Sequence, residues 1–161
     1  MQVIKFYMVK KIQIGDVVEI PTTKGLTYAQ YSHNNELCGE LLRILPGLFN
    51  KRPVNLEEVV SQTEIFSIFF PLRVAIKRKI FEVATNLPVP HFAIKFPLFR
   101  CGAVDPTSGK VRTWWLWDGE REWKVGDITQ EQRKLSLREI WNDTLLIEKI
   151  ESGWNPSNDP N

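Results

Sequence analysis

The chain has 161 residues, a formal net charge of +2, 43% hydrophobic residues and 25% charged residues. A chain of this length fits one domain, and its composition is that of a globular protein, which excludes a disordered or fibrous class. Because charges of both signs are interspersed, no long-range field indicates nucleic acid or an anionic membrane as a partner. The densest basic run, at 73–79, is interpreted as the solvated face of a short amphipathic segment.

The sequence also predicts a cytoplasmic location. Three lysines among the first eleven residues interrupt the apolar core that a signal peptide needs. The most apolar stretch, at 65–76, is far shorter than the ~20 residues that span a bilayer. Cys38 and Cys101 form no disulfide framework, which suits a reducing compartment, and both are interpreted as packing residues.

The first third of the chain contains three apolar runs, at 12–20, 27–32 and 38–45. Short segments rich in proline, glycine and asparagine separate them, and such segments favour turns. Parallel strands would need a crossover of about a dozen residues or more, so the short connections predict three sequential antiparallel strands.

The middle of the chain alternates between helix and strand signals. A helix is expected to begin after Asn55, where three apolar residues follow at the i, i+3, i+4 spacing of one buried face. Strands are predicted at 64–70 and 80–87, and 72–78 between them fits either helix or strand. Three prolines make 87–98 an irregular, stiffened connection.

Two further strands are predicted at 98–104 and 110–117. The five residues between them, Asp-Pro-Thr-Ser-Gly, are all turn formers, so they are expected to close a hairpin loop. With this hairpin, the sheet is expected to continue as a meander.

The C-terminal third carries helix signals. Threonine or serine followed three residues later by glutamine or glutamate, at 129–132 and 136–139, fits the capping-box spacing and predicts two short helices. A third helix is predicted at 143–152, where apolar residues share one side and Gly153 follows as a left-handed stop.

Together these elements predict one α+β domain over 1–154, with a polar, frayed tail at 155–161. The domain is expected to contain a curved, mainly antiparallel sheet and a few short helices, including the C-terminal ones. Short strands with a Gly-Asp entry leave open that part of the sheet forms an SH3-like barrel portion.

The strongest local signal is a tryptophan-rich hairpin at 114–125. Asp118-Gly119 is among the best two-residue turn signals, because both positions tolerate the positive φ of a type I′ turn. Centring the turn on this pair sets Trp117 opposite Glu120. The alternation of side chains along a strand then assigns every residue of the hairpin to one of two faces.

The two faces of the hairpin differ in character. One carries Trp114, Leu116, Arg121, Trp123 and Val125, and the other carries Trp115, Trp117, Glu120, Glu122 and Lys124. We expect the first face to join the core, since it is apolar apart from one arginine whose stem can cover its neighbour.

The second face carries three charges, so it cannot be simply buried, and Trp115 and Trp117 are expected to lie partly exposed as an interaction hot spot. The alternative is that the C-terminal helices or the proline-rich segment cover both indoles. A one-residue slip of the turn would exchange the faces.

Several chemistries lack their motifs. No two glycines lie closer than seven positions, which excludes the glycine-rich loops that cradle nucleotides. His33 and His91 are far apart, and neither has a partner at zinc-ligand spacing. No sequence pattern indicates a nucleophile paired with a base, and the thiol of Cys101 is interpreted as inert. We therefore expect no catalytic residue, no metal and no cofactor.

Several short motifs carry a resemblance to a known family. They are GDVVEIP at 15–21, YAQY at 28–31, GEL at 39–41, FFPL at 69–72, FPLFR at 96–100 and WWLWDG at 114–119. This pattern resembles the bacterial immunity protein 26 family over about residues 11–154. The resemblance implies a cytoplasmic, non-catalytic antidote that binds and blocks a toxin domain of a bacterial competition system, and it carries over no toxin-contacting residues.

The leading hypothesis is accordingly a protein-binding module whose partner is a toxin domain, with nucleic acid and membrane not expected and the oligomeric state open. Its predicted partner-binding residues are Trp115, Trp117, Asp118, Glu120, Glu122, Tyr28, Tyr31 and His33. The acidic residues among them give the slightly basic chain local charge complementarity for a partner.

Two alternatives remain open. One is a carbohydrate-active enzyme, because Glu120 and Glu122 would project from one face about 7 Å apart along a strand, within the range of glycosidase carboxylates. The other is an SH3-like structural or adaptor domain, since fold alone does not determine the ligand.

Overall fold

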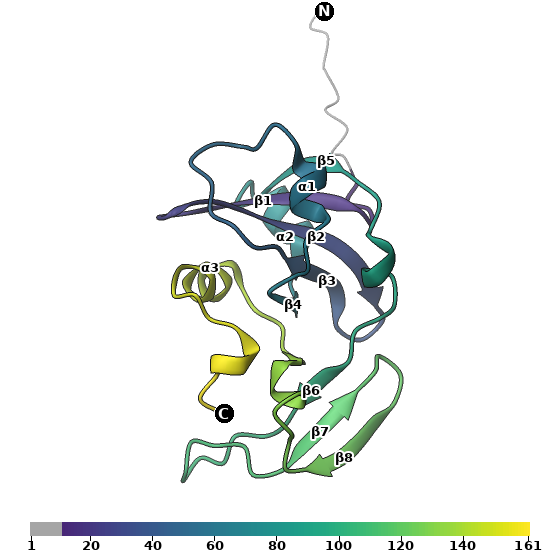
Figure 1. The fold of residues 1–161 in the computed structure, drawn as a ribbon, viewed down its shortest axis with the longest axis vertical. Coiled ribbons are helices and arrows are strands. Elements are labelled where there is room, and N and C mark those ends of the chain that lie inside the picture. Colours follow the sequence, from purple (N-terminus) through teal and green to yellow (C-terminus); the bar gives the residue numbers. More distant parts are fainter. Residues whose placement is uncertain (1–10) are drawn as a thin grey trace, which may run out of the picture.

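Two β-sheets organise residues 11–161, the part of the chain that this computed structural model describes (Figure 1). The first sheet contains β1 (Asp16–Thr22), β2 (Gly25–Asn35), β3 (Gly39–Ile44), β4 (Phe66–Phe69) and β5 (Glu82–Asn86), in the order β4-β3-β2-β1-β5. The second sheet contains β6 (Phe99–Cys101), β7 (Trp114–Trp117), β8 (Glu122–Gly126) and β9 (Ser136–Leu137), in the order β8-β7-β6-β9. The first ten residues of the expected domain lie outside the described residues.

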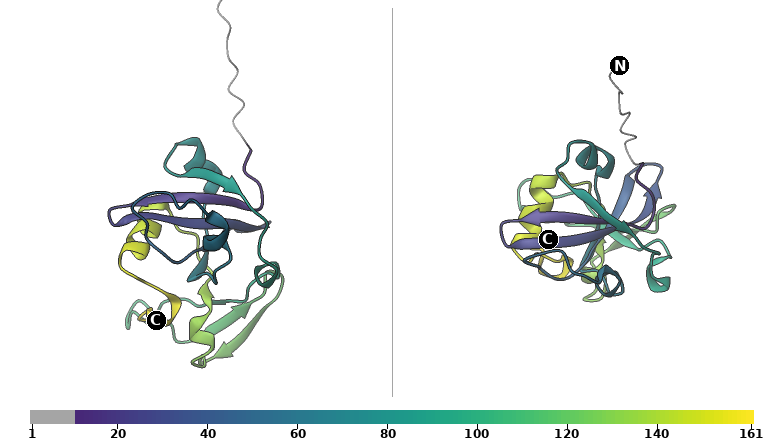
Figure 2. Two further views of the ribbon diagram at one scale, coloured as in Figure 1. Left: turned by 45° about the horizontal axis from the view of Figure 1, so that its top comes forward. Right: turned by 90° about the horizontal axis from the view of Figure 1, so that it is seen from above.

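Short helices accompany the sheets, which confirms the α+β class. They are α1 (Leu56–Val60), α2 (Leu72–Lys77) and α3 (Asp143–Glu151), with 3-10 turns η1 (His91–Ala93), η2 (Gln132–Lys134) and η3 (Pro156–Asn158). The left view of Figure 2 shows the second sheet, in green, as a separate layer below the purple and blue strands of the first sheet.

The order of the strands corrects one expectation. β1, β2 and β3 form the predicted antiparallel series, but β5 pairs with β1 at the far edge, and β6 begins the second sheet, so the continuous meander is wrong. The reason lies in the chain after β4, where α2 carries it across the sheet. The buried side chains of Leu72 and Ala75 hold this helix, and Phe81 then stacks on Phe70 at 5.1 Å. Neither sheet is closed into a barrel.

The capping signals have mixed outcomes. α3 begins as predicted, because the side chain of Asn142 accepts a hydrogen bond from Leu145 N at 2.8 Å. Thr129 and Gln132 form their reciprocal pair, but only η2 follows. The helix predicted from Ser136 is wrong: this residue begins β9, parallel to β6, and its hydroxyl accepts from the backbone N–H of Ser67 in β4 at 2.9 Å. Its side chain thus links the two sheets instead of capping a helix.

Three clusters of buried side chains form the interior. The largest lies between the first sheet and α3 and includes Leu146, Trp141 and Trp154. A second lies beneath α1. The third joins the two sheets and consists of Leu41, Phe69, Phe99 and Trp117.

The tail at 155–161 is ordered by a buried arginine, which corrects the expectation of fraying. Arg100 is fully buried, and its guanidinium donates to the carbonyl oxygens of Pro156 at 2.7 Å and Asn161 at 3.2 Å. The carboxylate of Asp159 accepts from the indole N–H of Trp154 at 3.0 Å. Because a buried guanidinium needs acceptors, these contacts fix the tail against the second sheet.

Truncation of Leu146 tests how much α3 contributes to the fold. Leu146 is fully buried in the largest cluster, so Leu146→Ala is expected to lower the free energy of unfolding by about 2–5 kcal/mol, as cavity-forming substitutions do. Urea denaturation measures this change. The control is Leu37→Ala, at a side chain 81% exposed, with an expected loss below about 0.5 kcal/mol. Equal losses in the two variants would show that α3 is not part of the core.

Candidate functional site

The turn of the tryptophan hairpin is centred on Gly119 and Glu120, one residue later than predicted. Asp118 N donates to Arg121 O at 3.1 Å, and Trp117 pairs with Glu122 rather than with Glu120. Of the two central residues only Gly119 has a positive φ, at +99°, whereas a type I′ turn requires positive φ at both positions.

The side chain of Asp118 explains the displaced turn. Its carboxylate accepts hydrogen bonds from the backbone N–H groups of Arg121 at 2.7 Å and Glu120 at 3.0 Å, a local closure that Asp commonly provides. These two bonds, that of Arg121 first, lower the pKa of Asp118. Gly119 also lies against the ring of Phe96, which adds a long-range constraint on the same turn.

The displacement leaves the faces of the hairpin unchanged, so the expectation that a one-residue slip of the turn would exchange them is wrong. The pairing moves by two residues along β8, an even number, so Leu116 now pairs with Trp123 and Trp115 with Lys124, each within the face predicted for it. An irregularity between Trp114 and Trp115 shifts only the far end of the ladder.

The two indoles of the second face are neither both exposed nor both covered. Trp115 is 37% exposed, as a hot-spot residue would be, whereas Trp117 is only 3% exposed. The ring of Phe96, from the proline-rich segment, packs edge-on to Trp117 at 5.5 Å, and the guanidinium of Arg138 lies 4.0 Å from its centroid. The expected partial exposure is therefore confirmed for Trp115, and the alternative, a covered indole, is confirmed for Trp117.

The first face is also divided. Trp114 and Leu116 are buried, as expected, but Trp123 is 40% exposed and Arg121 is exposed. The prediction of a core position for Trp123 is wrong because β8 is the edge strand of its sheet, where side chains have neighbours on one side only. The hairpin thus presents one partly exposed indole on each face.

Charged side chains of both signs surround Trp115. Across the second sheet, Lys124, Trp115 and Cys101 lie in one row, while Glu122 lies in the next. Arg138 follows β9 and donates to Glu122 Oε2 at 2.7 Å, which spans the sheet from edge to edge. We call this surface, formed by Trp115, Lys124, Glu122, Cys101 and Arg138, the outer face.

The other predicted partner-binding residues are placed unequally. Tyr28 is fully buried, and its hydroxyl donates to Glu19 at 2.7 Å; Tyr31 is 6% exposed in the largest cluster. His33 lies near the hairpin, edge-on to Phe96, with its Nε2 2.7 Å from Ile94 O. The structure therefore brings His33 to the hairpin and leaves both tyrosines inside the first sheet's two cores.

A cleft of about 510 Å³ adjoins the hairpin, and no sequence motif indicated it. Its rim includes Trp123, Asp118 and His33, and the half-exposed Phe92 of η1 contributes a second apolar wall. The cleft is of the size that holds one or more side chains of a partner or a small ligand. The only related feature of the sequence was the proline-rich segment around Phe92, which predicted a stiff connection but no cleft.

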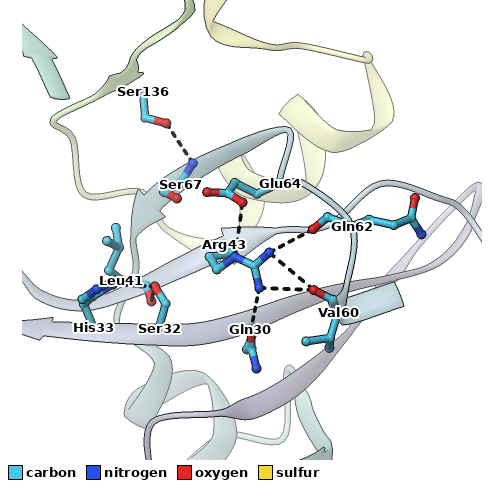
Figure 3. Close-up of polar contacts among 10 residues, drawn as sticks. All are labelled: Gln30, Ser32, His33, Leu41, Arg43, Val60, Gln62, Glu64, Ser67 and Ser136. Atoms are coloured by element: carbon cyan, nitrogen blue, oxygen red, sulfur yellow. Dashed lines mark hydrogen bonds and ion pairs between the residues drawn. The ribbon is translucent and has the colours of Figure 1, made fainter. Parts of the chain in front are cut away.

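The polar floor of the cleft is Arg43, at only 1% exposure. Its guanidinium donates to Gln30 Oε1 at 2.6 Å, to Gln62 O at 2.9 Å and to Glu64 Oε2 at 3.3 Å (Figure 3). The ring of Phe92 lies 5.4 Å from the guanidinium carbon. These contacts fix Arg43 in one position, so the floor is rigid before any ligand arrives.

The two glutamates of the carbohydrate hypothesis have separate environments. Glu120 is an exposed turn residue, and Glu122 is held by Arg138; neither lines the cleft. Within residues 11–161 no group of three His, Cys, Asp or Glu side chains is arranged to hold a metal ion. Over the same residues, no helix is long and apolar enough to cross a membrane.

Comparison of the chain with protein-family models, curated proteins and solved structures finds no significant match. The resemblance to the immunity protein 26 family thus stays a prediction from the motifs. The structural features that could form a binding surface are the outer face, Trp123 and the cleft.

Two glycines with positive φ, one in the hairpin turn and one in the loop before β7, are expected to differ in the stability lost on substitution by alanine. A Cβ at Gly119 would lie 2.8 Å from the Phe96 ring, and its φ of +99° already disfavours alanine. Gly119→Ala is expected to cost about 2 kcal/mol or more, from strain plus overpacking. At Gly109, φ is +70° but nothing lies within 4 Å, so Gly109→Ala is expected to cost about 1 kcal/mol. Thermal unfolding of both variants checks the order, and an equal cost would show that Phe96 yields freely.

Removal of the Arg43 guanidinium tests the floor of the cleft. Arg43→Met leaves carbonyl acceptors such as Gln62 O without their donor, so we expect a loss of about 3 kcal/mol in the free energy of unfolding. Glu64→Gln is the matched control: its side chain is 24% exposed, and the other guanidinium contacts remain, so its expected loss is about 1 kcal/mol or less. Chemical denaturation that ranks the two variants in the opposite order would contradict this account.

Proposed function

We propose that the chain is a non-catalytic protein-binding module, and specifically an antidote that binds a bacterial toxin domain through its tryptophan hairpin. The observation that carries the proposal is the partial exposure of two indoles, Trp115 at 37% and Trp123 at 40%, on opposite faces of one hairpin. Tryptophan is enriched among the residues that dominate binding energy at protein interfaces. A partner that holds the hairpin would bury both rings.

The surroundings of the indoles support a protein rather than a small molecule as the partner. Around Trp115 the outer face offers both a donor, Lys124, and an acceptor, Glu122, as the polar rim of an interface does. Beside Trp123 the cleft can accept a side chain of the partner between this indole and Phe92. Apolar anchors within a mixed-charge rim are the usual anatomy of such an interface.

The scaffold also favours tight association. The buried Trp117, on the same face of the hairpin as Trp115, packs against Phe96 and Arg138 and anchors the hairpin, and Asp118 closes its turn with two backbone hydrogen bonds. A surface that is already ordered loses little conformational entropy on binding.

The identification of the partner as a toxin domain rests on the motif resemblance. The charges limit what kind of partner it is: the carboxylates of Asp118 and Glu122 are engaged by backbone N–H groups and by Arg138, and only Glu120 among the three acidic residues has no ion pair or carboxylate hydrogen bond in residues 11–161. With a net charge of +2, the chain does not resemble a strongly acidic mimic of nucleic acid. The proposed partner surface is therefore apolar with moderate charge.

Binding to a toxin domain encoded beside this gene tests the proposal. Trp115→Ala and Trp123→Ala are each expected to weaken binding about thirtyfold, equivalent to about 2 kcal/mol, in isothermal titration calorimetry. Val54→Ala, at a fully exposed apolar residue outside the hairpin, is the matched control and should bind as the parent does. Unchanged affinity in both tryptophan variants would exclude the hairpin as the contact, and absence of toxin binding by the parent would exclude the antidote function.

A further inference from the structure

The strand β8 leaves one edge of the second sheet open. β8 pairs with β7 on one side, and among residues 11–161 no strand pairs with its other side. In Figure 1, β8 is accordingly the outermost strand at the lower right, with no described segment beyond it. An open edge presents unpaired backbone N–H and C=O groups, so it can serve as a template for pairing with a further strand.

The hydrogen bonds of the turn decide which backbone groups of β8 point to the open edge. Asp118 N donates to Arg121 O at 3.1 Å, so these two residues form a hydrogen-bonded pair across the hairpin. Hydrogen-bonded and non-hydrogen-bonded pairs alternate along an antiparallel ladder. Trp123 therefore directs its N–H and C=O toward β7, whereas Glu122 and Lys124 direct theirs to the open edge.

The residues at this edge are complementary to a second copy of themselves. When two β8 strands are aligned antiparallel about a two-fold axis at Trp123, Glu122 of each copy lies opposite Lys124 of the other. The residues that point outward then form the hydrogen-bonded pairs, and the tryptophans form the closer, non-hydrogen-bonded pair between them. Opposite charges and aromatic rings are both favourable cross-strand pairs. The backbone pattern and the side chains therefore fit the same alignment.

The side chains that this alignment uses are available for contact. Glu122 accepts from Arg138 with Oε2, at 2.7 Å, which leaves Oε1 without a hydrogen bond among residues 11–161. Lys124 is exposed and takes part in none of the ion pairs formed within the same residues. The indole of Trp123, at 40% exposure, retains apolar surface that a second indole can cover.

We propose that the chain forms a two-fold symmetric homodimer in which the β8 strands of two copies pair and join their second sheets into one. Charged residues on an edge strand normally prevent pairing, and lysines on both sides of Trp123 would repel their own copy. The opposite signs of Glu122 and Lys124 remove that protection. A short strand edge is a small interface, so the dissociation constant is expected to be in the micromolar range. The dimer does not depend on the proposed binding function, although a toxin that buries Trp123 would displace the second copy.

Charge-reversal variants test this dimer by sedimentation equilibrium at concentrations up to the millimolar range. The parent is expected to approach twice its mass of 18.7 kDa as its concentration rises. Glu122→Lys sets lysine opposite lysine, and Lys124→Glu sets glutamate opposite glutamate, so each variant alone should dimerise more than about tenfold more weakly. A mixture of the two variants restores opposite charges in both pairs, and it is expected to form a heterodimer. Because the heterodimer requires both variants to be folded, misfolding cannot account for this result.

Amide hydrogen exchange of the parent locates the contact. The backbone N–H groups of Glu122 and Lys124 are expected to gain protection as the concentration rises, while that of Trp123, already bonded within the hairpin, should not change. Glu58→Lys, which makes the same charge change at an exposed residue of α1, is the matched control and should dimerise as the parent does. A parent that stays monomeric, mixed variants that do not associate, or a dimer that protects β5 instead of β8 would each overturn the proposal.

Discussion

The contact that the hairpin depends on is the packing of four aromatic rings between the two sheets. Trp117 and Phe99 from the second sheet meet Phe69 from the first, with centroids 5.4–5.9 Å apart, and Phe96 closes the group from the proline-rich segment. Each such ring buries a large apolar area and prefers tilted or offset neighbours. Because Trp117 is committed to this group, the hairpin is fixed in direction, and Trp115 and Trp123 are left to face solvent.

Elements that follow from local chemistry were predictable from the sequence. The first three strands needed only short turns between apolar runs, α1 an asparagine start signal with one apolar side, and α3 one apolar side with a glycine stop. Features that long-range contacts decide were not predictable. The hairpin turn moved by one residue because Phe96 and the side chain of Asp118 act on it together, and Trp123 is exposed because β8 is an edge strand, which no local pattern reveals.

The candidate site was only partly foreseeable for the same reason. Trp115 and His33 were proposed from composition and position, and the structure places both near the hairpin. Arg43, the floor of the cleft, occurs within an apolar strand where a charge has no obvious role until Gln30 and Gln62 are brought beside it. Buried arginines of this kind satisfy carbonyls from distant loops, and their partners come only from the tertiary fold.

The other buried arginine, Arg100, bears on where the domain ends. Composition predicts a domain boundary after Trp154, yet two of the three acceptors of the Arg100 guanidinium, the main-chain oxygens of Pro156 and Asn161, lie beyond that boundary. A fragment cut at the apparent boundary would keep the guanidinium inside the protein with only the acceptor of its Nε, Leu135 O at 3.3 Å, and would remove two oxygens that compensate its desolvation. The polar residues 155–161 are therefore held on the folded domain by hydrogen bonds to two buried side chains, those of Arg100 and Trp154.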